Sequence, residues 1–206
     1  MSSEASESGS RMHETTTLLQ KPQGPHSAAH AGNAEGMQSH ENIRNGRTPL
    51  HYAAKYDHVE TVRVLLEFDE PHDVKCNEGR TPLSYAAENG HEKPVEAPLK
   101  SGARHDLKCN EGRTPLIYAA KSDRVETVKV LLRFGAQHDV KCNEGRTPLI
   151  YAAESGHAKT VEALLESGAQ YDLECNEGRT PATFAAENGH VEALQLLMNA
   201  KHRSSG

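Results

Sequence analysis

The four cysteines of this 206-residue chain are equally spaced, and this spacing constrains the fold more than any other feature. They stand at positions 76, 109, 142 and 175, so each gap is 33 residues. An even number of cysteines in a small secreted domain can indicate disulfides. Equal spacing instead indicates one position of a repeated unit. The tripeptide Arg-Thr-Pro recurs with the same period, starting at Arg47, Arg80, Arg113, Arg146 and Arg179.

The composition suits a repeat array better than one large core. Only 35% of the residues are hydrophobic, 4% are aromatic, and there is no Trp. A thin layered core between stacked units can be built from Ala and Leu. The period therefore predicts an array of repeats with boundaries at 44–76, 77–109, 110–142, 143–175 and 176–206.

The fourth unit, 143–175, shows what each unit is expected to build. Residues 143–146 form a turn signal, because Gly145 tolerates the positive φ of a tight turn. Thr147-Pro148 then starts a helix, since Thr caps free N–H groups and Pro loses no hydrogen bond there. A second helix carries its apolar residues on one side, at Val161, Leu164 and Leu165. Neither helix can bury its apolar face alone, so the units must stack.

The run Gly46-Arg47-Thr48-Pro49-Leu50-His51-Tyr52-Ala53-Ala54 is similar to the signature of the ankyrin repeat, whose period is also 33 residues. The resemblance covers roughly residues 44–200. It implies an all-α ankyrin-repeat solenoid, in which stacked helix-turn-helix units carry β-turn fingers. It also implies that the turn tips and inner helices form a concave protein-binding surface.

The chain departs from the family's Thr-Pro-Leu-His motif after its first occurrence. The motif is complete only at His51, so a Thr–His hydrogen bond is expected in the first unit alone. The equivalent positions in the later units hold Ser84, Ile117, Ile150 and Thr183.

A second departure is Pro98, which stands where the other units have leucine in the outer helix. Proline inside a helix costs about 3 kcal/mol or more. We expect a distorted or shortened outer helix in unit two, which would make this unit the weakest joint. Whether that joint is a hinge or tolerated decay is left open by the sequence.

The first 43 residues differ from the array. They hold seven Ser and no aromatic residue, with two basic and five acidic side chains. Such a segment cannot bury enough apolar surface to offset chain entropy. The sequence predicts a disordered, acidic, Ser-rich tail over residues 1–43. Residues 28–43 faintly echo a unit, and a degenerate half-repeat there is the alternative.

The cysteines also invite a chemical interpretation, because His72, His105 and His138 each precede a cysteine by four residues. A metal or redox ladder would need its ligands on one centre, and zinc takes four at about 2.0–2.3 Å. Stacked helices lie about 8–10 Å apart, so ligands from neighbouring units are too far apart to share one centre. Small turn residues copied with the repeat are the favoured interpretation, and no metal site or cofactor is predicted.

The sequence shows no catalytic constellation, because every Cys, His or Asp of note recurs once per unit. We therefore expect a protein that is not an enzyme. An aromatic residue also recurs with the period, and we interpret it as inner-helix packing with each hydroxyl reaching the rim. These residues are Tyr52, Tyr85, Tyr118, Tyr151 and Phe184.

The turn tips and the ends of the inner helices are the candidate protein-binding surface. The tips repeat Asn-Glu-Gly-Arg, which fits either recent duplication with a solvated charged edge or a periodic, extended partner. We expect Arg80, Arg113 and Arg146 to supply charge-assisted hydrogen bonds, and Tyr56 an aromatic anchor. The charged inner-helix rim would set the register of the partner through Lys55, Glu88, Lys121, Glu154 and Glu187.

Charge and hydropathy narrow the classes of partner and the cellular compartments that are expected. The formal charge of −6 argues against sequence-independent nucleic-acid binding. No window of about 18 apolar residues is present, so no membrane insertion is expected. The start lacks the features of a secretory signal, which leaves the cytoplasm or nucleus, and a monomer is expected.

These features favour a non-enzymatic adaptor or scaffold that binds an unidentified protein partner through its concave face. One alternative is a regulatory subunit, or a fragment, of a larger enzyme or signalling complex whose catalytic part lies on another chain. A metal or redox sink built on the His–Cys ladder is a third hypothesis.

Overall fold

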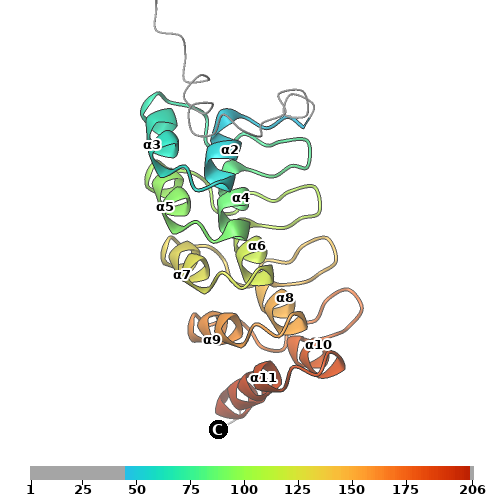
Figure 1. Ribbon diagram of the computed structural model, residues 1–206. Helices are drawn as coiled ribbons and strands as arrows, with labels where there is room; N and C mark the ends of the chain where they lie inside the picture. The colour runs from blue at the N-terminus through green and yellow to red at the C-terminus, as the bar shows by residue number, and fades with distance from the viewer. Residues whose placement is uncertain (1–44, 205–206) are drawn as a thin grey trace, which may run out of the picture.

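The protein is a single stack of antiparallel helix pairs in the computed structural model, which describes residues 45–204 (Figure 1). The predicted tail at 1–43 and the half-repeat at 28–43 lie outside the described residues. The inner row holds α2 (Pro49–Lys55), α4 (Pro82–Asn89), α6 (Pro115–Lys121), α8 (Pro148–Glu154) and α10 (Pro181–Glu187). The outer row holds α3 (Val59–Glu67), α5 (Glu92–Lys100), α7 (Val125–Arg133), α9 (Ala158–Glu166) and α11 (Val191–Ser204).

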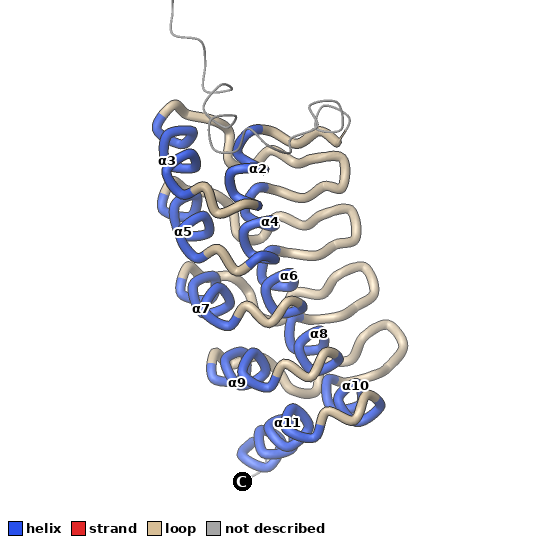
Figure 2. Tube along the Cα trace, in the orientation of Figure 1, coloured by secondary structure: helices blue, strands red, loops and turns tan. Residues whose placement is uncertain are grey.

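Long loops join each outer helix to the next inner helix and project to the same side as fingers (Figure 2). Residues 45–204 contain no strand. The predicted all-α solenoid is therefore confirmed. No helix in this described part combines the length and the apolar character needed to cross a membrane.

The Thr-Pro pair starts every inner helix as the sequence predicts. In repeat four the Thr147 hydroxyl accepts a hydrogen bond from the Ile150 backbone N–H at 3.2 Å, and Pro148 occupies the first helical turn. Repeat one uses its histidine as well, because the Thr48 N–H donates to His51 Nδ1 at 3.0 Å. Extended Thr and fixed proline backbones thus define where each inner helix begins.

The core is a thin layer of apolar side chains, many of them alanines, between the two rows of helices. One cluster of buried apolar residues runs from Ala54 in repeat one to Leu197 in repeat five. Each of the first four inner helices contributes an alanine pair that is almost completely buried, such as Ala119 and Ala120. Because these side chains are small, the inner helices approach closely, and stability comes from contacts between neighbouring repeats.

The sequence predicts a distorted or shortened outer helix at Pro98, and the prediction of shortening is wrong. Helix α5 has nine residues, as do α3, α7 and α9. Only one backbone hydrogen bond is lost, since the Pro98 nitrogen would have bonded the carbonyl of Pro94. Pro98 is buried in the position of the leucines, and its own carbonyl accepts from the N–H groups of Ser101 and Ala103 at 3.0 and 2.9 Å.

A stability cost at Pro98 is still expected, because the lost hydrogen bond is not replaced. We predict that Pro98→Leu raises the free energy of unfolding by about 1–3 kcal/mol. It should also slow hydrogen exchange in α5 relative to α9. Denaturant titration with exchange mass spectrometry checks this, and unchanged stability would show that the helix accommodates proline without cost.

Candidate functional site

The fingers form a row that is cross-linked by hydrogen bonds from one repeat to the next. The Asn110 side-chain amide donates to the Asn77 carbonyl at 2.9 Å, and the Asn110 N–H donates to the Glu78 carbonyl at 3.1 Å. Gly79 has φ of 74°, and a Cβ there would lie 2.3 Å from the Asn110 side-chain oxygen, so only glycine fits. The same contacts join the next fingers, which makes the row one continuous surface.

Arginine and aromatic side chains alternate along the base of the fingers. The Arg80 guanidinium lies between two rings, 3.9 Å from the centroid of Tyr85 and 4.1 Å from that of Tyr118 in the next repeat. Arg146 lies 5.0 Å from Phe184 in the same way. Such cation–π contacts are strongest where the cation is desolvated. We call this set the arginine–aromatic ladder: Arg47, Tyr85, Arg80, Tyr118, Arg113, Tyr151, Arg146, Phe184 and Arg179.

The ladder arginines also form ion pairs with the rim of the inner helices. Arg80 pairs with Glu88, and only 11% of its side chain is exposed. In repeat four Arg146 pairs with Glu154 at 2.8 Å, and Arg179 pairs with Glu187 at 2.9 Å in repeat five. The arginine charges are thus neutralised within the chain, and each pair fixes the orientation of a rim carboxylate.

Repeats one and three have lysine at the rim and therefore lack this pair. Lys55 Nζ lies 5.2 Å from the ring of Tyr56, which is 50% exposed. Lys121 is exposed and lies 5.9 Å from the Tyr151 ring, while Arg113 donates to the Tyr151 hydroxyl at 3.2 Å. Neither lysine forms an ion pair within residues 45–204. Lys121 therefore places an uncompensated positive charge at the centre of the array.

The rim residues of the first four repeats are also held through their backbone by the following repeat. His91 Nε2 donates to the Lys55 carbonyl at 2.9 Å, and His157 Nε2 donates to the Lys121 carbonyl at 3.1 Å. Arg124 takes the place of histidine in repeat three and donates to the Glu88 carbonyl at 3.1 Å. These bonds satisfy carbonyls at the ends of the inner helices. The rim glutamates are in addition held by ion pairs with arginines, whereas the rim lysines are not.

A comparison with protein-family models agrees with this architecture. The model of ankyrin repeats in three copies matches residues 5–106 and 95–175. The chain belongs to the ankyrin repeat family. No curated protein matches the chain at a significant level. Ankyrin repeats are generally protein–protein interaction modules and are typically non-catalytic.

The structure brings the predicted residues of the ankyrin surface together in pairs that sequence reasoning missed. Arginine and rim glutamate of one repeat stand eight residues apart, and the finger folds back to join them. The regular offset between the two residues is the signal that could have indicated the pairing. The role of the nine predicted residues as partner contacts stays a prediction.

The expectation that each tyrosine hydroxyl reaches the rim is wrong. The Tyr118 hydroxyl instead donates to the buried Cys109 thiol at 3.3 Å. Tyr151 approaches Cys142 at 3.4 Å, and burial raises the pKa of this tyrosine to about 12. The physical reason is that the rings pack inward under the fingers, where the polarizable thiol lies within hydrogen-bond reach of the hydroxyl.

The described cysteines are free and buried, and they serve packing in this fold. Within residues 45–204, no three His, Cys, Asp or Glu side chains gather closely enough to hold a metal ion. His72, His105 and His138 are thus not brought together with the cysteines as a ligand set.

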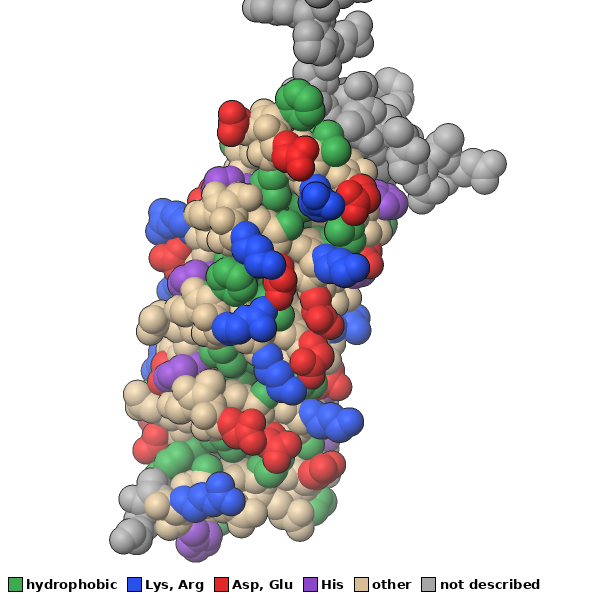
Figure 3. All heavy atoms as spheres, turned by 90° about the vertical axis from the view of Figure 1, so that its left-hand side faces the viewer, with side chains coloured by type: hydrophobic (Ala, Val, Ile, Leu, Met, Phe, Trp, Pro, Cys, Tyr) green, Lys and Arg blue, Asp and Glu red, His purple; other side chains and the backbone are tan. Residues whose placement is uncertain are grey.

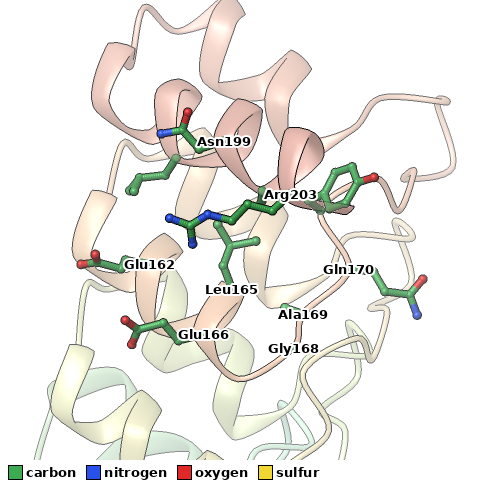
Figure 4. Close-up of a pocket in the computed structure, with 11 residues that line it drawn as sticks. Glu162, Leu165, Glu166, Gly168, Ala169, Gln170, Asn199 and Arg203 are labelled. Carbon is green, nitrogen blue, oxygen red and sulfur yellow. The ribbon is translucent and has the colours of Figure 1, made fainter. Parts of the chain in front are cut away.

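The outer-helix side of the ankyrin array has a different character. Acidic and basic side chains are interspersed over it (Figure 3). An open hollow of about 530 Å³ lies between α9 and α11 (Figure 4). Arg203 extends over Leu165 there, and Glu162 and Glu166 lie at the edge of the hollow. No side chain lining it has the buried, desolvated charge typical of a catalytic site.

Proposed function

We propose that this ankyrin array is a non-enzymatic adaptor or scaffold that binds a protein partner through the face formed by its fingers and inner-helix rim. The observation that carries the proposal is the ordered rim, in which the next repeat holds the rim carbonyls of repeats one to four and an arginine of the same repeat holds each rim glutamate. A surface that is ordered before binding loses little conformational entropy when a partner binds.

The available binding groups follow from which side chains the array leaves unpaired. Tyr56 offers an exposed aromatic anchor at one end, and Lys121 offers an uncompensated cation in the middle. Interface energy generally concentrates in a few such residues. The partner is then an extended protein segment that presents an acidic group to Lys121. As a further part of this proposal, the protein acts in the cytoplasm or nucleus.

The test is quantitative capture of partners on the full chain, with charge-reversal variants matched within one repeat. Lys121→Glu changes the finger-side rim, and Lys129→Glu makes the same change on the outer face of α7. We expect Lys121→Glu to weaken capture of the main partner at least tenfold, and Lys129→Glu to leave it within twofold.

Tyr56→Ala is expected to weaken capture of the same partner, because it removes an exposed ring that lies beside Lys55 and His58 at the surface. Circular dichroism of all three variants checks that they fold. Loss of capture with Lys129→Glu, and no loss with Lys121→Glu, would place the binding site on the outer helices and contradict the proposal.

A further inference from the structure

Helix α3 and the residue after it expose apolar side chains whose counterparts in repeat three are more deeply buried. Val64 in α3 is 37% exposed, whereas Val130 in α7 is 6% exposed. Phe68 directly after α3 is 61% exposed, whereas Phe134 after α7 is half-buried and packs against the core. Hydrophobic side chains are also visible at the upper end of the stack in Figure 3.

The two helices differ in their neighbours and hardly in their sequences. Residues 59–68 read Val-Glu-Thr-Val-Arg-Val-Leu-Leu-Glu-Phe, and residues 125–134 differ from them only at two charged positions. Helix α7 packs on α5 of the preceding repeat. Within residues 45–204, no outer helix precedes α3. Repeat one is therefore built as an internal repeat, with a face that fits an outer helix before it.

The 33-residue register continues into the chain before repeat one. Gly36 stands one period before Asp69, and the later positions of this series hold glycines with φ between 91° and 94°. Met37 stands one period before Glu70 and two before Ala103, both of which are buried. Ile43 stands one period before the buried Cys76. Gly36, Met37 and Ile43 thus suit the turn and the two buried positions that follow an outer helix.

The residues in register with α3 itself are mostly small. Positions 26–34 align with 59–67 and contain four alanines, at 28, 29, 31 and 34. Small side chains at these positions leave space for Phe68. The family match begins at residue 5, before this segment.

We propose that residues 26–43 of this same chain cover the face of α3 that carries Val64 and Phe68. This shifts the half-repeat expected at 28–43 into register with the array. The segment ends next to the first finger, so its covalent connection gives it a high effective concentration at α3. A second copy of the chain has no such advantage.

A photo-cross-linking residue at position 68 of the full chain tests the occupant directly. With benzoyl-phenylalanine in place of Phe68, irradiation is expected to give a product of monomer mass, cross-linked within residues 26–43. The same residue in place of Phe134 is the positive control and should cross-link to repeat two. A dimer-mass product, a cross-link to residues 1–25, or no cross-link at all would overturn the proposal.

Hydrogen exchange gives an independent measurement on the full chain. Phe68→Asp is expected to accelerate exchange in residues 59–67 at least tenfold, because it removes the apolar contact with the covering segment. Arg63→Asp is the matched control, since Arg63 lies on the same helix with 59% of its side chain exposed. Equal exchange rates in both variants would show that nothing covers Phe68.

Discussion

Replacing Arg80 with glutamine is expected to lower the free energy of unfolding by about 2–4 kcal/mol. Its guanidinium lies between the rings of Tyr85 and Tyr118, and a desolvated cation–π contact contributes up to about 2 kcal/mol. The substitution also breaks the partly buried ion pair with Glu88. Because the two rings belong to different repeats, this loss is expected to weaken the joint between repeats two and three.

The control for this prediction is Arg133→Gln on the outer face. Arg133 also forms an ion pair, with Glu96, but its side chain is 64% exposed. Exposed ion pairs contribute about 0–1 kcal/mol. Arg80→Lys adds a third point, since lysine keeps the charge and loses the flat stacking surface, and we expect about half the full effect. Urea denaturation of the three variants makes the comparison, and similar losses at Arg80 and Arg133 would show that the ladder does not stabilise the array.

Acid is expected to destabilise the array through His51. This imidazole is 1% exposed, accepts from the Thr48 N–H and donates to the Arg80 carbonyl. Burial, together with the cations of Arg47 and Arg80, lowers its pKa to about 4. An unfolded histidine titrates near pH 6.5. Between these values the unfolded state binds the proton and the folded state does not, so stability falls as the pH falls.

The contribution of His51 is complete above about pH 6.5 and is lost progressively toward pH 4, by roughly 3 kcal/mol in all. His51→Ser tests it, because Ser84 at the equivalent position of repeat two already caps its helix with Thr81. The variant is expected to be less stable than the wild type at pH 7 and to lose less stability between pH 6.5 and 4. Parallel stability–pH curves would contradict the assignment.

The positions of the helices can be predicted from local sequence signals. Thr147-Pro148 and the period of the cysteines are sufficient to place the inner helices and the fingers. Pro98 was misjudged because local propensity ignores the packing of α5 between its neighbours, which keeps the helix at full length. The burial of Arg80 was also not predictable, because it depends on a ring supplied by the next repeat.

Contacts within the chain change how a repeated charge is interpreted. The examples are Arg80, Arg113 and Arg146. As isolated residues in a turn tip they look available to a partner. In the structure they stack on aromatic rings or pair with carboxylates, and the unpaired groups are elsewhere, at Tyr56 and Lys121. Reversing the ladder arginines would therefore change stability and binding together, which is why the rim lysine is the better probe.

A hydrogen-exchange footprint of the full chain bound to its captured partner tests the binding face most directly. We predict slower exchange in the finger tips at 77–80, 110–113 and 143–146 and at the carboxyl ends of α4, α6 and α8. Exchange in the outer helices α5, α7 and α9 should stay unchanged. Protection confined to the outer helices, with the fingers exchanging as in the free protein, would contradict the proposed adaptor surface.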